Sequence, residues 1–379
     1  MKINWIEYEN TRTGLKIDRV RFYNNLTLLV GLSGAGKTTI LNAVSLFQDI
    51  VNRKYRKEMF DTVLIIGFEI ESKNYEWHIK FGKNEELNNY KDEKEEKNIK
   101  IPVLEEYFLI DGEFYFKKDS NGIIYNGKDM PGLSQTMSCI NLFDNDYIVQ
   151  KIVKEFHYIS MYSTYSIAPK SINPVPYKVM ERFGDNGNDV INSFIQEGAF
   201  DYAFYVKLCL LQENEMYEIF DKIKQSYINI FNTVEDLYFE FDKSTYSYTL
   251  YQKEKDVISP ISIDNFSSGM LKILIFLTNL YTCEPGFIFL IDELENSFGV
   301  NCLDAMVEII QDCEEDFQFI ITSHHPYIIN NIDVSDWNIV ERKGSVINAI
   351  QAKDLKIGST RRDAFFELIN YWKFHLMKE

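Results

Sequence analysis

The residues with the clearest chemistry form the run GLSGAGKT, residues 31–38, and the threonine after it. Glycines at 31, 34 and 36 let the backbone curl, so that consecutive amide hydrogens point at phosphate oxygens. Lys37 can reach the β- and γ-phosphates of ATP, and the Thr38 hydroxyl can ligate Mg²⁺. We therefore expect a phosphate-binding loop made by Gly31, Ser33, Gly34, Ala35, Gly36, Lys37, Thr38 and Thr39.

A second candidate is FIFLIDE, residues 287–293, in which five apolar residues lead into two carboxylates. Such a run is typical of a buried central strand. Asp292 can hold the magnesium ion, directly or through water, and Glu293 can polarise the attacking water. Taken alone, the run is better explained as a buried strand that ends in a charged loop; together with the phosphate loop it predicts a nucleotide hydrolysis site.

Two further segments can complete such a site. In NFSSGMLKI, residues 265–273, Ser267 and Gly269 can present a hydroxyl and an amide to a γ-phosphate at a helix start, although alone they indicate only an N-cap. In FIITSHHP, residues 319–326, a second buried strand ends at His324, which can contact the γ-phosphate. The adjacent His325 leaves that assignment ambiguous by one position.

In order and spacing these four stations resemble the ABC-type ATPases of the SMC and OLD (overcoming lysogenization defect) superfamily. The chain also resembles the compact ATPase subunits of bacterial anti-phage systems of the Septu, PARIS or retron-linked type. The resemblance covers roughly residues 1–165 and 260–345. It implies ATP and Mg²⁺ as cofactors, with Glu293, His324 and Ser267 as catalytic residues.

The same resemblance implies a head-to-tail dimer, in which Ser267 and Gly269 act as the signature segment on the ATP of the opposite chain. Two departures stand out. FSSGM replaces the usual LSGGQ, and Phe298 and Gly299 stand where SMC proteins have an aspartate after the second motif. Gln135 is a weak candidate for the Q-loop glutamine.

From this family we expect a regulatory or sensor ATPase that controls a separately encoded effector, a nuclease or toxin, in anti-phage defence. OLD nucleases carry a Toprim nuclease domain after the ATPase, and residues 325–379 are too few to hold one. The alternatives are a DNA-repair or chromosome-associated ATPase that binds DNA directly, the nucleotide-binding subunit of a transporter, and an ABC-type anticodon nuclease.

The elements that must position these residues predict an α/β fold, a P-loop NTPase with a β-rich N-terminal lobe, a parallel-sheet core and an inserted helical region. Strands are expected before residue 30, at 63–70, at 75–81 and at 237–250, and a hairpin is expected at 106–125; helical periodicity runs from about 171 to 236. The expected segments are 1–165 for the first half of the ATPase, 166–259 for the helical insert, 260–345 for the second half and 346–379 for a strand and helical tail. Between the expected strand at 75–81 and the expected hairpin at 106–125 lies a charged segment, 83–100. The tail helix either packs on the core or docks a partner.

Composition limits the remaining options. A net charge of −17 argues against a surface that wraps nucleic acid unaided, since phosphate contacts need clustered cations. The best local patch is Arg53, Lys54, Arg56 and Lys57, which we expect to be solvated side chains near a helix end. Apolar stretches are too short to span a membrane, and the N-terminus has no apolar signal core, so we expect a cytoplasmic protein. Five scattered cysteines indicate reduced thiols.

Overall fold

A computed structural model of the chain describes residues 1–83, 101–130, 136–162, 175–177, 200–213, 217–296, 300–355, 357 and 361–376. The chain divides into two compact units. Unit 1 comprises Met1–Met161, Gly286–Leu294 and Glu314–Glu379, and unit 2 comprises Tyr162–Pro285 and Glu295–Cys313. Several sequence-based expectations lie outside the described residues: the charged segment from residue 84 onward, Gln135, Phe298 and Gly299.

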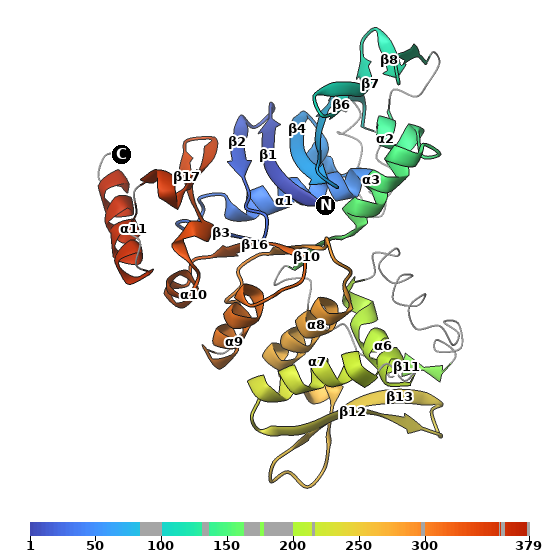
Figure 1. Ribbon diagram of the computed structural model, residues 1–379, viewed down its shortest axis with the longest axis vertical. Helices are drawn as coiled ribbons and strands as arrows, with labels where there is room; N and C mark the ends of the chain where they lie inside the picture. The colour runs from blue at the N-terminus through green and yellow to red at the C-terminus, as the bar shows by residue number, and fades with distance from the viewer. Residues whose placement is uncertain are drawn as a thin grey trace. The chain divides into compact units, whose positions relative to one another are not determined.

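In the part of the chain that the structure describes, unit 1 is built on one sheet of 14 strands in the order β10-β15-β16-β3-β17-β18-β2-β1-β4-β5-β6-β7-β8-β9 (Figure 1). The strands are β1 (Lys2–Asn10), β2 (Leu15–Arg21), β3 (Leu26–Val30), β4 (Thr62–Ile70), β5 (Lys73–Phe81), β6 (Val103–Ile110), β7 (Glu113–Asp119), β8 (Gly122–Tyr125), β9 (Lys128–Asp129), β10 (Ile159–Tyr162), β15 (Ile288–Ile291), β16 (Gln318–Ser323), β17 (Trp337–Lys343) and β18 (Val346–Gln351).

The strands at the centre of this sheet run parallel. β16 pairs in parallel with β15 on one side and with β3 on the other, and β3 pairs in parallel with β17. β3, β15 and β16 are buried along their whole length, as strands covered on both faces must be. Since parallel strands end at the same edge of a sheet, the loops that follow these three strands are brought together, and they carry the phosphate loop, Asp292 and His324.

The other half of the sheet is an antiparallel lobe, which confirms the expected β-rich early region. β1, β4, β5, β6, β7 and β8 pair in succession with alternating burial. The predicted turn at 111–112 joins β6 to β7, and both residues have positive φ, as two-residue hairpin loops require. Trp77, Phe108 and Phe156 are fully buried in its core, where ring centroids of Trp77 and Phe156 lie 5.7 Å apart.

The helices of unit 1 are α1 (Lys37–Val51), α2 (Cys139–Leu142), α3 (Tyr147–His157), α10 (Pro326–Asn331) and α11 (Arg361–Leu376), with short 3₁₀ turns at Lys57–Met59, Val334–Asp336 and Ala352–Leu355. α1 extends from the end of β3 and lies along the sheet (Figure 1). Apolar side chains at three- and four-residue spacing, from Ile40 to Phe47, give it its buried face. In α11, Ala364 and Leu368 are fully buried, so the tail helix packs against its own unit, the first of the two expected outcomes.

Unit 2 contains the inserted helices together with a small sheet. Its elements are α6 (Phe200–Glu213), α7 (Tyr217–Ile230), α8 (Ser268–Thr282), α9 (Val300–Gln311), β11 (Val175–Pro176), β12 (Val234–Asp242), β13 (Ser247–Glu254), β14 (Ile261–Ser262) and a 3₁₀ turn at Ile263–Asn265.

One local expectation for unit 2 is confirmed and one needs correction. The strand character expected at 237–250 is present as the hairpin of β12 and β13, in which Asp242 accepts a hydrogen bond from the Ser244 amide at the turn. Val175 and Pro176, which the helical periodicity covered, instead pair with β13 as a short edge strand, where the missing proline N–H is tolerated.

Two general features complete the description. The five cysteines are free thiols, and three of them are buried. Within the described residues, no helix combines the length and the apolar character that crossing a bilayer would take.

Candidate nucleotide site

The glycine-rich run forms the link between β3 and α1 that its sequence predicts. Gly34 and Gly36 have φ values of 81° and 102°, in the left-handed region that only glycine adopts readily, and Gly36 is the N-cap residue of α1. Ser33 and Gly34 are exposed, Ala35 is buried, and Thr39 lies in the first turn of the helix. The loop thus presents its backbone at the positive end of a helix of 15 residues.

Lys37 is held inside this loop. Its Nζ donates hydrogen bonds to the carbonyl oxygens of Gly31, at 2.8 Å, and Leu32, at 3.1 Å, and the residue is only 8% exposed. The ammonium group therefore lies where the loop backbone converges, as a group that binds phosphate must.

Two residues on neighbouring strands, which no sequence motif indicated, contact the loop. A Cβ atom added at Gly31 would lie 2.5 Å from the carbonyl oxygen of Val340 on β17, and one at Gly36 would collide with the side chain of Ile347 on β18. Ile347 is fully buried. Both glycines are therefore required by close approach, and the neighbouring strands fix the position of the loop.

The carboxylate at the end of β15 meets the loop. Thr38 Oγ1 lies 3.0 Å from both carboxylate oxygens of Asp292, although 254 residues separate the two in the chain. This contact joins the two motifs and brings together the two predicted metal ligands.

The residue at the end of the neighbouring strand β16 binds the same carboxylate. Thr322 Oγ1 lies 2.7 Å from Asp292 Oδ1 and 2.7 Å from the backbone nitrogen of Glu293. Glu293 has φ +52°, a left-handed conformation that is uncommon for a residue other than glycine. The only sequence signal for Thr322 was its place among the small hydroxyl residues that end the predicted strand.

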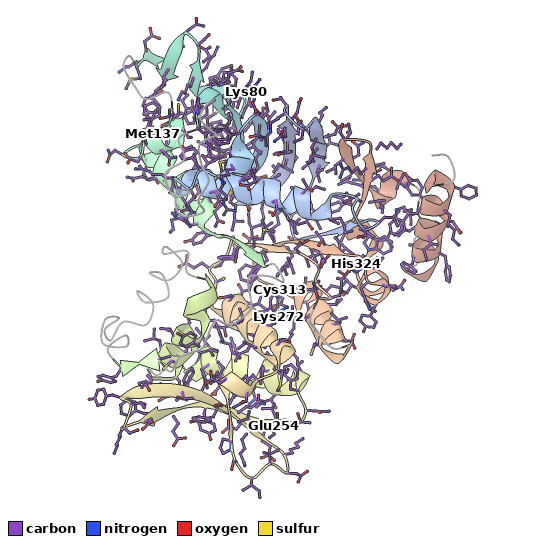
Figure 2. The ribbon with its side chains drawn as sticks, turned by 180° about the vertical axis from the view of Figure 1, so that it is seen from behind. Lys80, Met137, Glu254, Lys272, Cys313 and His324 are labelled. Carbon is purple, nitrogen blue, oxygen red and sulfur yellow. The ribbon has the colours of Figure 1, made fainter. Side chains whose placement is uncertain are left out.

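The two adjacent histidines have different surroundings. His325 is the N-cap of α10, and its Nδ1 accepts a hydrogen bond from the Tyr327 amide at 3.2 Å. His324 is exposed and directly follows β16, as Figure 2 shows. A local structural role thus occupies His325 and leaves His324 as the candidate for contact with a nucleotide.

The ligand set at Thr38 and Asp292 fits Mg²⁺. That ion prefers oxygen ligands and is usually held by one or two carboxylates together with phosphates and water. A hydroxyl and a carboxylate provide this chemistry, and the described residues contain no cluster of three or more side chains that could hold a metal ion alone. A magnesium ion here would complete its coordination with phosphate oxygens and water.

The predicted signature residues lie in unit 2, at the start of α8. Ser267 is its N-cap, with Oγ accepting a hydrogen bond from the Met270 amide at 3.2 Å, and Gly269 lies in its first turn. Lys272, one turn further and labelled in Figure 2, is 7% exposed, and burial lowers its pKa. Its Nζ lies 3.5 Å from the carbonyl oxygen of Asn296.

Two comparisons with known proteins give matches, one to a family model and one to solved structures. The family model described as "AAA domain, putative AbiEii toxin, Type IV TA system" matches residues 175–330. No curated protein matches the chain. A solved structure titled as the SmcHead bound to the C-winged helix domain of ScpA has a TM-score of 0.55 at 11% identity, over 94% of this chain and 100% of that one.

Two further solved structures give lower scores. The Smc head with an extended coiled coil, bound to the C-terminal domain of ScpA derived from Pyrococcus furiosus, has a TM-score of 0.49 at 12% identity, covering 94% of this chain and 98% of that one. The SMC head domain from Thermotoga maritima has 0.45 at 10%, covering 93% and 99%. From the loop geometry and the SmcHead match together, the chain has the mixed α/β fold of an SMC-type P-loop ATPase head, with helical insertions.

Proposed function

We propose that this chain is an ABC-type ATPase that binds ATP with Mg²⁺ and hydrolyses it. The observation that carries the proposal is the hydrogen bond between Thr38 Oγ1 and the Asp292 carboxylate, at the mouth of a glycine loop that holds Lys37. Two segments 254 residues apart supply these groups, and a merely structural loop has no need of that convergence. The SMC-head fold supports the proposal.

Each residue has a role in this reaction. The loop amides and Lys37 bind and orient the phosphates. Thr38 and Asp292 would hold the metal ion, which when bound neutralises charge that develops on the phosphates. Glu293 accepts a proton from the attacking water, and His324 orients the γ-phosphate and that water.

We further propose that two chains share each site. In this arrangement Ser267 and Gly269 complete the ATP site of a second chain, arranged head to tail, so that nucleotide state controls dimer closure. The N-cap geometry of Ser267, with Gly269 in the first turn of the helix, supports the role, because helix N-termini favour phosphate.

The output of such a switch is proposed to be a separately encoded effector, a nuclease or toxin, in anti-phage defence. Two findings support it. The matching family model carries a toxin–antitoxin description, and the solved SmcHead is bound to another protein. Co-expression with the product of an adjacent gene, with and without a hydrolysis-deficient variant of this chain, would test the control.

The alternative of direct DNA binding is less well supported. In the basic segment after α1, Arg53 pairs with Asp144 at 2.9 Å and Arg56 pairs with Asp49 at 2.9 Å. Both arginine side chains are about half exposed, as expected, but their charges are matched by carboxylates. Burial raises the pKa of Asp49 to about 6, and the charge and hydrogen bond of Arg56 act against that rise by stabilising the ionised carboxylate. Arg56 is therefore engaged with Asp49 rather than available to bind a phosphate.

Replacement of Lys37 by alanine tests the ATP site. Charged hydrogen bonds contribute about 1.5–3 kcal/mol each, so Lys37→Ala should weaken ATP binding by roughly ten- to a hundredfold or more. Lys54→Ala, which removes an exposed lysine just beyond α1, is the matched control and should bind as wild type. Isothermal titration with ATP, with circular dichroism to verify folding, measures both. An unchanged affinity in folded Lys37→Ala would remove the assignment of the phosphate loop.

A further inference from the structure

We infer that Thr322 is a positioning residue of this site, one that fixes both the metal-binding carboxylate and the backbone of the proposed catalytic glutamate. This inference rests on the proposed ATPase function, and its first test does not require hydrolysis. The sequence pattern of β16 pointed only to the histidine beyond the strand, and Thr322 lies two residues before it.

The hydroxyl of Thr322 has its directions fixed. A backbone N–H can only donate, so Oγ1 accepts from the Glu293 amide at 2.7 Å, and its single proton is then donated to Asp292 Oδ1 at 2.7 Å. The carbonyl oxygen of Thr322 also accepts from the Leu294 amide at 3.1 Å. Thr322, which has no exposed surface, therefore binds Asp292, Glu293 and Leu294, the three consecutive residues that follow β15.

The hydrogen bonds of the Glu293 and Leu294 amides flank the strained backbone of Glu293. Glu293 has a left-handed backbone, with φ +52°, in which its Cβ crowds the following carbonyl oxygen, so the conformation is unfavourable for a residue with a side chain. Such a conformation persists only where its surroundings impose it. The amides of Glu293 and Leu294 are both tied to Thr322, so relaxation of φ would break at least one of these bonds and swing the glutamate side chain to a new direction.

The same hydroxyl also sets the orientation of the Asp292 carboxylate. Oδ1 accepts the proton of Thr322, and the single proton of Thr38 Oγ1, which lies 3.0 Å from both carboxylate oxygens, is shared between Oδ1 and Oδ2, so that Oδ1 carries the greater share of the hydrogen bonds. Oδ2 is thus the oxygen left with capacity for a cation. Loss of the Thr322 bond would free the carboxylate to rotate.

Three variants separate this role from ordinary packing. Thr322→Val keeps the shape and removes the hydroxyl, and Thr322→Ser keeps the hydroxyl. Thr27→Val is the matched control, because Thr27 is also fully buried in a central strand and its hydroxyl accepts from a backbone amide, that of Tyr23, at 2.7 Å.

The first readout uses the protein without nucleotide: hydrogen exchange at the Glu293 and Leu294 amides. In Thr322→Val the Glu293 amide loses its hydrogen bond to the hydroxyl and should exchange about fivefold faster or more. The Leu294 amide keeps its bond to the backbone carbonyl of residue 322, so its exchange should rise only as far as the backbone of Glu293 relaxes. Thr322→Ser and Thr27→Val should leave both amides near the wild-type rate. Unchanged exchange at the Glu293 amide in Thr322→Val would overturn the inference, whether or not the protein hydrolyses ATP.

The second readout is hydrolysis. Thr322→Val should lower kcat by roughly 10- to 100-fold with little change in KM for ATP, and should raise the Mg²⁺ concentration needed for half-maximal rate. Thr322→Ser should restore most of kcat. Equal kcat in the valine and serine variants would contradict the role, whereas a wild-type chain that hydrolyses no ATP would count against the proposed function instead. If Thr322→Val fails to fold, Thr322→Ala against Thr322→Ser makes the same comparison.

Discussion

The two predicted halves of the ATP site differ in how the fold holds them. In unit 1 the phosphate loop, Asp292 and Glu293 are joined by hydrogen bonds between residues about 30 to 254 positions apart, so the strand ends define the geometry. In unit 2, the partners of Ser267 among the described residues are local, because its hydroxyl caps its own helix, in whose first turn Gly269 lies. The proposed first half is held by long-range hydrogen bonds, whereas the proposed second half has the geometry of an ordinary helix start.

This difference indicates where each half acquires its function. Residues that bind nucleotide within one chain need precise mutual placement, and the parallel sheet provides it. A segment that acts on another chain needs only an exposed hydroxyl and free helix amides, which become catalytic when a second chain supplies the phosphate. Loss of hydrolysis and loss of nucleotide binding should therefore follow from different residues.

The largest effect should come from Glu293→Gln. Removing the base should slow hydrolysis roughly a hundred- to ten-thousandfold, while ATP affinity stays within about threefold of wild type, because Lys37 and Thr38 are intact. Single-turnover hydrolysis and ATP titration measure the two quantities. Equal loss of affinity and rate would mean that Glu293 supports binding rather than the chemical step.

A smaller effect tests the support below the loop. In Gly36→Ala the alanine must adopt φ near +102°, and its Cβ collides with Ile347. The variant should lose about 2–4 kcal/mol in its free energy of unfolding, or the same free energy in ATP binding if the loop moves instead. Gly34→Ala has similar backbone strain, with φ +81°, but meets no neighbouring atom within 4 Å, so it should cost only about 1 kcal/mol.

The collision also predicts a rescue. Ile347→Val removes the methyl group that lies nearest to the added Cβ, and it should restore part of the loss in Gly36→Ala. Urea unfolding and ATP titration of the wild type, Gly36→Ala, Gly34→Ala, Ile347→Val and the Gly36→Ala/Ile347→Val double variant provide the measurement. If the two glycine variants behave alike, the strands below the loop have no part in positioning it.

The sequence predicted those parts of the molecule whose determinants are contiguous. The strand, loop and helix around Gly31–Thr38 follow from one short run, and the alternating strands of the lobe and the helix at 217–230 were equally accessible. Contacts that depend on strand order could not be predicted from the sequence. The approach of Ile347 to Gly36 and the bonds of Thr322 depend on which strands are neighbours in the sheet, and the left-handed backbone of Glu293 has no sequence signature.

Local side-chain bonding accounts for the remaining differences. The turn at Asp242 divides the predicted strand region 237–250 into two strands, because the Asp242 carboxylate accepts a hydrogen bond from the Ser244 amide. The ambiguity between His324 and His325 depended on an N-cap bond to the Tyr327 amide, which only the course of the chain after β16 could reveal.

The most direct test of the account is the hydrolysis rate per chain as the wild-type protein is diluted, with light scattering at each concentration. Ser267→Asp is the matched variant, because aspartate caps a helix as well as serine does but places a carboxylate where the other chain's γ-phosphate would lie. The account predicts that the wild-type rate per chain falls as dimer gives way to monomer, and that Ser267→Asp binds ATP yet stays slow at every concentration. A wild-type rate per chain that remains constant down to concentrations where only monomer scatters, or a fully active Ser267→Asp, would contradict the shared site.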